Sequence, residues 1–424
     1  MARARRAFEA WRHVSAADRG RLLRRLADGI DGRREQLART EARNAGKPIA
    51  DARGEMEMVA ESFAYYAGAP ERLTGKTIPV EGGVDMTFRE PLGVCALIVP
   101  WNFPLVILSW KLAPALAAGN AAVVKPAELT PLSALALVDI AREAGLPDGL
   151  IEVVAGKGSV VGRRLVEHPD VAKVAFTGST EVGRGIAAGA AQTIKRVTLE
   201  LGGKSANVVF ADADLSAAAA AAPMAVFGNA GQDCCARSRI LVERPAVDDF
   251  LAAMRDVVRG LRVGDPLDEA TQMGPLISAG QRETVAAFVP DDRHVAFRGS
   301  APDGPGFWYP PTVLYPVDRH DRAVAEEIFG PVAAVLPFDT EEEAIALAND
   351  TIYGLSGSIW TRDGARALRM ARAVEAGTLS VNSNTSVRVG TPFGGMKQSG
   401  IGRELGPDAL EAYTEVKNVY FSTA

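Results

Sequence analysis

Histidine and cysteine are scarce in this chain, and their scarcity excludes several kinds of site. The 424 residues include four histidines and three cysteines, with no HxxxH or CxxC spacing, so we expect no metal site. An odd number of cysteines in a long chain is typical of free thiols in a reducing compartment, which favours a cytoplasmic protein. The net charge of −5 and the lack of long basic runs argue against a nucleic-acid partner.

Long uninterrupted apolar segments are missing too. Residues 93–110 are long enough to span a bilayer, but Pro100, Asn102 and Pro104 interrupt them, so we interpret them as strand, turn and helix. The arginine-rich N-terminus has no continuous apolar stretch of the kind that signal peptides carry. We interpret it as a surface helix, with a transit peptide as the alternative, and we expect no membrane partner.

What the chain does contain is a regular alternation of apolar runs and helical patterns. Hydrophobic residues make up 47% of the sequence, which is enough for the cores of two or three domains. From Val94 onward, β-branched runs such as "VCALIVP" and "VAKVAFTGS" alternate with helical segments such as "PLSALALVDIAREAG". This order is typical of parallel sheets that helices cover on both faces. We therefore predict an α/β fold with two such domains that meet near residues 202–203.

Residues 75–93 interrupt this pattern. They alternate like a two-stranded ribbon around Gly82 and Gly83, and the C-terminal "EVKNVYFST" is another strand without a sheet of its own. Unpaired strands of this kind usually pair with each other or with another subunit.

Three segments carry residues suited to acyl chemistry. Cys234 and Cys235 are adjacent in "GNAGQDCCARSR", so either one is a nucleophile or both are buried filler. Glu200 lies in the apolar run "LELGGK", where burial would raise its pKa towards that of a general base; a buried ion pair with Lys204 is the alternative. Asn102, in the turn "PWNFP", can donate a hydrogen bond to an oxyanion or cap the turn.

Two further segments suit a nucleotide. "GSTEVG", residues 178–183, follows an apolar strand and opens a helix, which suits phosphate binding by backbone N–H groups, although it is not the GxGxxG fingerprint. Lys125 and Glu128 follow another strand, where a carboxylate can accept hydrogen bonds from ribose hydroxyls. A salt bridge at the entry of a helix is the alternative for this pair.

Together these segments resemble the aldehyde dehydrogenase superfamily over essentially the whole chain. The motifs that carry the resemblance stand in the family's order: "VPWNFPL", "KPAELTP", "FTGSTEVGR", "LELGGKSANVVFADADL", "FGNAGQDCCARSR", "MGPLIS", "EEIFGPV" and "PFGGMKQSGIGRELG". Eight motifs in one order are far more specific than any one of them. The resemblance implies oxidation of an aldehyde to a carboxylic acid, with NAD as the cofactor and NADP as the alternative.

The resemblance also assigns roles to individual residues. The catalytic positions that it implies are the nucleophile Cys234, the general base Glu200, the oxyanion donor Asn102 and the proton-relay pair Lys111 and Glu404. The cofactor positions are Trp101, Lys125, Glu128, Gly178, Ser179, Gly183, Glu327 and Phe329, and the candidate substrate positions are Phe103, Trp110, Asp233 and Arg388. In this pattern Cys235 is a bystander, and the presence of Glu200 favours hydrolysis of a thioester over transfer to coenzyme A.

The architecture that the resemblance implies has two Rossmann-like domains and a small β ribbon. The predicted parts are a cofactor-binding domain at 1–74 and 91–202, to which 399–411 return, a catalytic domain at 203–398, and oligomerisation strands at 75–90 and 412–424. We expect a homodimer or homotetramer. In relatives the first helix follows an N-terminal segment with its own strands; we expect its absence from this sequence to affect stability or cofactor affinity, without removing a catalytic position.

Other functions and several substrates stay open at this point. A catalytically inactive scaffold, or a thiol esterase that uses Cys234 and Glu200 without a cofactor, would not need the cofactor positions. Asp233 beside the nucleophile suits the ammonium group of an aminoaldehyde such as 4-aminobutyraldehyde, whereas Arg388 suits the carboxylate of a semialdehyde. If the two charges neutralise each other, the substrate is a neutral aldehyde.

Overall fold

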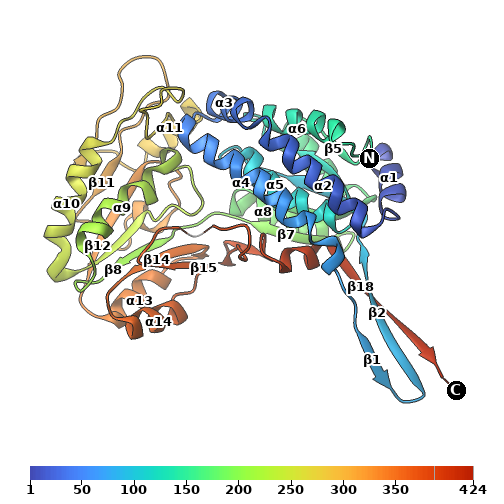
Figure 1. Cartoon of the computed structure of the whole chain (residues 1–424). Helices are drawn as coiled ribbons and strands as arrows, with labels where there is room; N and C mark the ends of the chain where they lie inside the picture. The colour runs from blue at the N-terminus through green and yellow to red at the C-terminus, as the bar shows by residue number, and fades with distance from the viewer. Residues whose placement is uncertain (386, 424) are drawn as a thin grey trace.

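The computed structural model describes residues 1–385 and 387–423, so residues 386 and 424 of the predicted catalytic and C-terminal segments lie outside the described residues. Figure 1 shows two α/β bodies side by side and a narrow ribbon of three strands that projects away from them. The predicted α/β class, with two parallel-sheet domains and a small ribbon, is confirmed. No helix in the described part of the chain has the length and apolar character that a membrane span requires.

The first sheet has the strand order β17-β7-β6-β3-β4-β5 and is parallel except for β17. Its strands are β3 (Val94–Ile98), β4 (Ala121–Lys125), β5 (Ile151–Val153), β6 (Val171–Thr177), β7 (Arg196–Glu200) and β17 (Gly400–Ile401). Its helices are α1 (Ala2–Trp11), α2 (Ala16–Asp31), α3 (Arg34–Ala45), α4 (Ile49–Ala67), α5 (Pro104–Ala117), α6 (Leu132–Glu143), α7 (Arg163–Glu167) and α8 (Thr180–Ala191). Every residue of β3 and β4 is buried, which explains their continuous apolar runs.

The second sheet has the order β10-β11-β12-β9-β8-β14-β15, and only β10 is antiparallel to its neighbour. Its strands are β8 (Ala206–Val209), β9 (Arg239–Glu243), β10 (Val295–Arg298), β11 (Thr312–Leu314), β12 (Val332–Phe338), β14 (Ser356–Trp360) and β15 (Thr378–Val381). Its helices are α9 (Leu215–Phe227), α10 (Val247–Gly260), α11 (Ala279–Ala286), α12 (Arg322–Ala325), α13 (Glu341–Asn349) and α14 (Gly364–Ala373). Two short strands, β13 (Tyr353–Gly354) and β16 (Met396–Lys397), pair apart from this sheet.

The second sheet buries a separate hydrophobic cluster on each face. Successive side chains of a strand point to opposite faces, so Ile240 of β9 packs into the cluster that contains Phe250 of α10. Its neighbour Leu241 packs into the cluster that contains Met370 of α14. Both faces of the second sheet are therefore buried away from water, as is usual for a parallel sheet.

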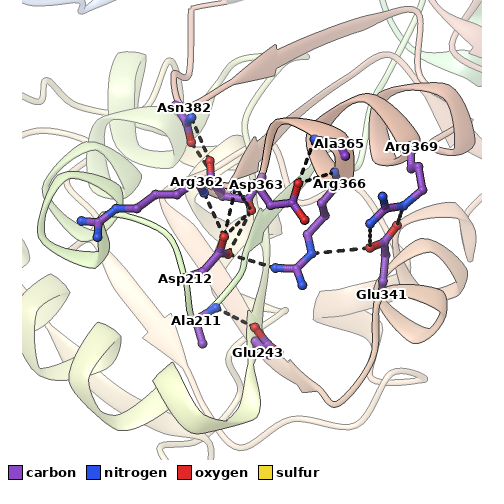
Figure 2. Close-up of polar contacts among 11 residues, drawn as sticks. Ala211, Asp212, Glu243, Glu341, Arg362, Asp363, Ala365, Arg366, Arg369 and Asn382 are labelled. Carbon is purple, nitrogen blue, oxygen red and sulfur yellow. Dashed lines mark hydrogen bonds and ion pairs between the residues drawn. The ribbon is translucent and has the colours of Figure 1, made fainter.

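Asp212, just after β8, connects this strand to the segment that joins β14 to α14 (Figure 2). Its carboxylate accepts hydrogen bonds from the Thr361 hydroxyl at 2.8 and 2.9 Å and from the backbone N–H groups of Arg362 and Asp363, both at 3.1 Å. It also forms an ion pair with Arg366 at 3.0 Å. These contacts satisfy the first N–H groups of the turn before α14 and fix that helix on the sheet.

The projecting ribbon consists of β1 (Thr77–Val80), β2 (Gly83–Pro91) and β18 (Thr414–Ser422), all antiparallel. The two orphan segments therefore pair with each other, which is one of the two alternatives that the sequence left open. Apolar side chains are exposed on it: Ile78, Val80, Phe88, Val416, Tyr420 and Phe421. A cluster of exposed apolar side chains of this kind is typical of a protein–protein contact surface. The role in oligomerisation and the domain boundaries given above stay predictions.

Candidate active site

Neighbouring strands of the first sheet end at one edge, and their ends carry predicted site residues. The register pairs Ile98 of β3 with Lys125 of β4 and with Phe176 of β6, and it pairs Thr177 with Glu200 of β7. The turn after β3, the loop after β6 and the end of β7 therefore lie together. Carboxyl ends of parallel strands are where α/β folds place their ligand sites.

Two adjoining cavities lie at this edge. The smaller, of about 280 Å³, is lined by residues of both domains: Pro100, Trp101, Asn102, Ile107, Thr177, Gly178, Ser179, Leu201, Gly202, Cys234, Gln281, Glu327 and Phe329. The larger, of about 760 Å³, extends towards Lys125, Glu128, Gly158 and Ile186. Both are lined by Pro100, Trp101, Thr177 and Gly178, so they adjoin. Cys234 thus lies at one end of a long groove.

The loop before Cys234 has an unusual and tightly packed backbone. Asn229 and Ala230 have φ of 51° and 55°, a left-handed conformation that side-chain-bearing residues rarely adopt. A Cβ at Gly231 would lie 2.2 Å from neighbouring backbone, and one at Gly203 would lie 2.3 Å from the carbonyl oxygen of Cys234. Only glycine fits at these two positions, and the close packing fixes the Cys234 backbone in place.

Burial separates the two adjacent cysteines. Cys234 is partly exposed and lines the smaller cavity, whereas Cys235 is buried. The backbone N–H of Cys235 donates a hydrogen bond of 2.8 Å to the Oδ1 atom of Asp233. The thiol that a ligand in the cavity can reach is therefore the one that the sequence predicts.

Asn102 connects the turn after β3 to the Cys234 loop. Its side-chain nitrogen donates to the carbonyl oxygen of Gln232 at 3.0 Å, and the side chain of Asn229 donates to the Asn102 carbonyl oxygen at 3.1 Å. Asn102 is buried but lines the cavity beside Cys234. Because an amide nitrogen carries two hydrogens, one remains for a ligand oxygen.

Glu200 is a buried carboxylate, and neither of its oxygens has a hydrogen-bond partner. The alternative of an ion pair with Lys204 does not hold, since the Lys204 nitrogen has no partner either. Burial first, and then the charge of Glu404, raises the pKa of Glu200 well above its usual value, although Lys111 and Arg403 oppose the shift. A carboxyl group in this environment is suited to accepting and returning protons.

Lys111 and Glu404 form a buried ion pair. Lys111 is on α5, and Glu404 lies on an isolated β-bridge with Phe393. Both charges are close enough to Glu200 to shift its pKa. The structure therefore brings the two predicted relay residues together beside the predicted base.

Lys125 and Glu128 line the larger cavity but do not pair with each other. The Oε1 atom of Glu128 accepts a hydrogen bond of 2.8 Å from the backbone N–H of Gly158. Burial lowers the pKa of Lys125, and the charge of Glu128 opposes this shift. The alternative of a helix-entry salt bridge therefore gives way to two groups that both face the groove.

The helix α8 begins at this groove. Ser179 is its N-cap, and the Ser179 hydroxyl accepts a hydrogen bond of 3.4 Å from the Val182 N–H. A Cβ at Gly183 would lie 2.5 Å from the Leu201 side chain, so glycine lets the first turn pack closely against the end of β7. Gly178 lines both cavities. The N-terminal N–H groups and the helix dipole suit a pyrophosphate here.

Glu327 and Phe329 reach the smaller cavity from the second domain. The Oε1 atom of Glu327 accepts a hydrogen bond of 2.9 Å from the Gly203 N–H. Burial raises the pKa of Glu327 to about 7, against the opposing effects of that bond and of Lys204. Phe329 has φ of 55° and packs edge-on against Trp101, with 5.2 Å between ring centroids.

The four candidate substrate residues differ in their surroundings. Phe103 lies under the Lys47 nitrogen, 4.5 Å from its ring centroid, and Trp110 is buried against Phe393. Asp233 is partly exposed beside Cys234, whereas Arg388 is exposed and forms no ion pair with it. None of the four lines either of the two cavities, and their substrate roles stay predictions.

Several site residues were missed from the sequence. Gln281 of α11 lines the smaller cavity and donates a hydrogen bond of 2.8 Å to the Phe329 carbonyl oxygen. Nothing in its local sequence marks it. Asn229 and Gly158 could have been proposed as site residues from the sequence, since both stand in glycine-rich turns, "GNAG" and "GKGS".

Comparison with known proteins agrees with this geometry. The sequence model of the aldehyde dehydrogenase family matches residues 1–419. An aldehyde dehydrogenase of Aspergillus niger is 44% identical over 99% of this chain and 86% of its own, and a betaine aldehyde dehydrogenase of Bacillus subtilis is 42% identical over 100% and 89%. The solved structure of a Bacillus cereus aldehyde dehydrogenase in complex with NAD+ superimposes with a TM-score of 0.98, at 42% identity over 100% of this chain and 88% of that one. The resemblance seen in the sequence is confirmed, and the chain belongs to the aldehyde dehydrogenase family.

Proposed function

We propose that the protein oxidises an aldehyde to a carboxylic acid, with NAD as the hydride acceptor and Cys234 as the nucleophile. The observation that carries this proposal is the continuity of the groove. Lys125, Glu128 and the start of α8 would hold a nucleotide in the larger cavity, which adjoins at Trp101 the cavity that Cys234 lines. Bacterial relatives with NAD in their solved structures support the choice of cofactor.

The first step is attack of the Cys234 sulfur on the aldehyde carbon. A hydrogen bond with Cys235, burial, and the charges of Asp233 and Glu327 raise the pKa of Cys234 well above its usual value, so the attack needs a proton acceptor. Glu200, directly or through water, is the buried base available for it. The side-chain amide of Asn102 and the backbone N–H of Cys234 donate hydrogen bonds to the oxyanion that forms.

The second step is hydrolysis. NAD held at Lys125, Glu128 and the start of α8 would supply a hydride acceptor, and loss of hydride from the tetrahedral carbon would leave the acyl group as a thioester on Cys234. Once the proton from Cys234 has left for solvent, Glu200 takes a proton from the attacking water and returns it to the Cys234 sulfur as the thioester bond breaks and the acid leaves. The Lys111–Glu404 pair beside Glu200 passes the proton towards solvent.

The test is the formation of NADH with a panel of aldehydes. Oxidation coupled to NADH formation supports the proposal. Ester hydrolysis without NAD, and without NADH formation from any aldehyde, would identify the thiol esterase instead. A folded protein with neither activity would be the inactive scaffold.

We predict that kcat/KM is at least about tenfold higher with NAD than with NADP, which corresponds to about 1.4 kcal/mol. The exposed carboxylate of Glu128 can accept hydrogen bonds from ribose hydroxyls and repels a 2′-phosphate. Replacement of Glu128 by Gln removes the repulsion and should narrow the preference, whereas Glu9→Gln, on the exposed face of α1, should not. A parent enzyme that uses NADP with the higher kcat/KM would refute the assignment.

For the substrate, we propose an aldehyde that carries a cationic group. Asp233 stays partly exposed beside the nucleophile, and no ion pair with Arg388 neutralises it. The relatives named betaine aldehyde dehydrogenases support a cationic substrate, because betaine aldehyde carries a quaternary ammonium group.

Accordingly, Asp233→Asn should raise the KM for 4-aminobutyraldehyde about tenfold or more, and the KM for butanal much less. The reason is the loss of one charge pairing in a partly desolvated site. Steady-state kinetics with both substrates measure it, and Arg388→Gln serves as the control that changes neither. Equal effects of Asp233→Asn on the two substrates would contradict the proposal and favour a neutral aldehyde.

A further inference from the structure

Three potential metal ligands stand together at the nucleophile: the residue before it, the nucleophile itself and the residue after it. The carboxylate of Asp233 and the thiols of Cys234 and Cys235 offer three ligand atoms that all lie within 4.8 Å of one another. In the described part of the chain this is the one group of three histidine, cysteine or acidic side chains close enough to share an ion. The oxidation of an aldehyde requires only the thiol of Cys234.

The spacing of these atoms suits a soft divalent cation. Thiolates select soft metals such as Zn²⁺ and Cd²⁺, which prefer tetrahedral coordination. With metal–sulfur bonds of about 2.3 Å, tetrahedral ligands lie about 3.8 Å apart. The three donor atoms lie within 4.8 Å of one another, and because Cys234 lines the smaller cavity, the fourth coordination position would be open to that cavity.

Access and charge favour binding as well. Cys234 and Asp233 are partly exposed, so an ion can enter through the cavity, while the buried Cys235 closes the site from behind. Glu327 lines the same cavity and offers a further carboxyl group near the site. The tightly packed backbone at Gly203 and Gly231 already holds this loop in place, which lowers the entropic cost of assembling the ligands.

We propose that Asp233, Cys234 and Cys235 form an inhibitory chelating site for a soft divalent cation such as Zn²⁺ or Cd²⁺. On binding, each thiol forms a metal–sulfur bond and its proton goes to solvent; no electron is transferred. The ion occupies the sulfur that attacks the aldehyde, so it stops turnover. Inhibition rests on the proposed role of Cys234, but binding does not. Unlike the ligands of HxxxH and CxxC motifs, these three are consecutive in the sequence.

Titration of the reduced protein with Cd²⁺ tests the site directly, through the ultraviolet charge-transfer absorbance of cadmium thiolate. We expect one ion per chain with the absorbance of two thiolates. Since even residues behind a ligand change affinity about 10–100-fold, Cys235→Ser should weaken binding at least about 100-fold and halve the absorbance per ion. Asp233→Asn should weaken binding without changing the absorbance. Cys95→Ser, at the third and fully buried cysteine, should bind as the parent does.

The same variants separate binding from inhibition. Cd²⁺ should stop NADH formation by the parent and by Cys95→Ser at equal concentrations, and Cys235→Ser should need at least about 100-fold more. Parent affinity and absorbance in Cys235→Ser would overturn the proposal, as would a parent protein that gives no two-thiolate signal. If Cys235→Ser loses its circular dichroism spectrum, Cys235→Ala gives the same readouts. If the protein binds Cd²⁺ in this way but oxidises no aldehyde, the proposed function is wrong and the proposed metal site still stands.

Discussion

Cys234→Ala and Cys234→Ser should lose aldehyde oxidation by at least about 10⁴-fold, whereas Cys235→Ala should keep most of the parent rate. The reason is access. Cys234 lines the same cavity as the proposed oxyanion donor Asn102, whereas Cys235 is buried and does not line it. A serine hydroxyl in place of the thiol is too weak a nucleophile at neutral pH without a dedicated base partner.

NADH formation at saturating aldehyde and NAD measures the effect, and circular dichroism checks that each variant is folded. Cys95→Ala is the matched control, since this fully buried cysteine of β3 is far along the chain from the Cys234 loop. It should lower the free energy of unfolding slightly through the lost sulfur contacts and leave kcat unchanged. If the Cys234 variants are active and the Cys235 variant is inactive, Cys235 rather than Cys234 is the nucleophile.

The sequence predicted the sheets because strands buried on both faces, such as β3 and β4, consist of continuous apolar runs. It also predicted which strand ends carry the site, because parallel strands share one carboxyl edge. The choice between Cys234 and Cys235 could not come from the residues alone. Both are small and apolar, and only their exposure to the cavity separates them.

Other features depended on contacts between distant segments. The hydrogen bond from the Gly158 N–H to Glu128 joins residues 30 positions apart, and no local sequence pattern predicts it. Gln281 reaches the cavity only because α11 packs beside Phe329. The sequence left Glu200 with Lys204 as an alternative partner, and the structure leaves both without a partner. A buried charged group without a partner costs stability, so its retention at this position points to function.

Because burying Glu200 without a partner costs stability, we expect Glu200→Gln to stabilise the folded protein. Because the folded protein holds the Glu200 proton more tightly than the unfolded chain does, the folded state binds more protons, and its stability falls as pH rises above the usual carboxyl pKa. Glutamine cannot ionise. The variant should therefore unfold at a higher temperature than the parent at neutral and alkaline pH, and the difference should vanish towards acid pH.

Whereas Glu200→Gln should raise thermal stability, it should lower the rate of turnover. Loss of the base should slow the attack by Cys234, whose proton solvent can also take, less than it slows hydrolysis of the thioester. The thioester therefore accumulates, and rapid mixing should show a burst of about one NADH per site and then a steady rate lower by about 10²–10⁴-fold. In the parent, the rate should fall as the pH drops through the raised pKa of Glu200, since the protonated acid cannot accept a proton. Glu9→Gln, at the exposed α1 position, should show neither change. Steady turnover at the parent rate with no burst would remove Glu200 from the mechanism, while a slow rate combined with higher thermal stability would identify it as a base kept at a cost in stability.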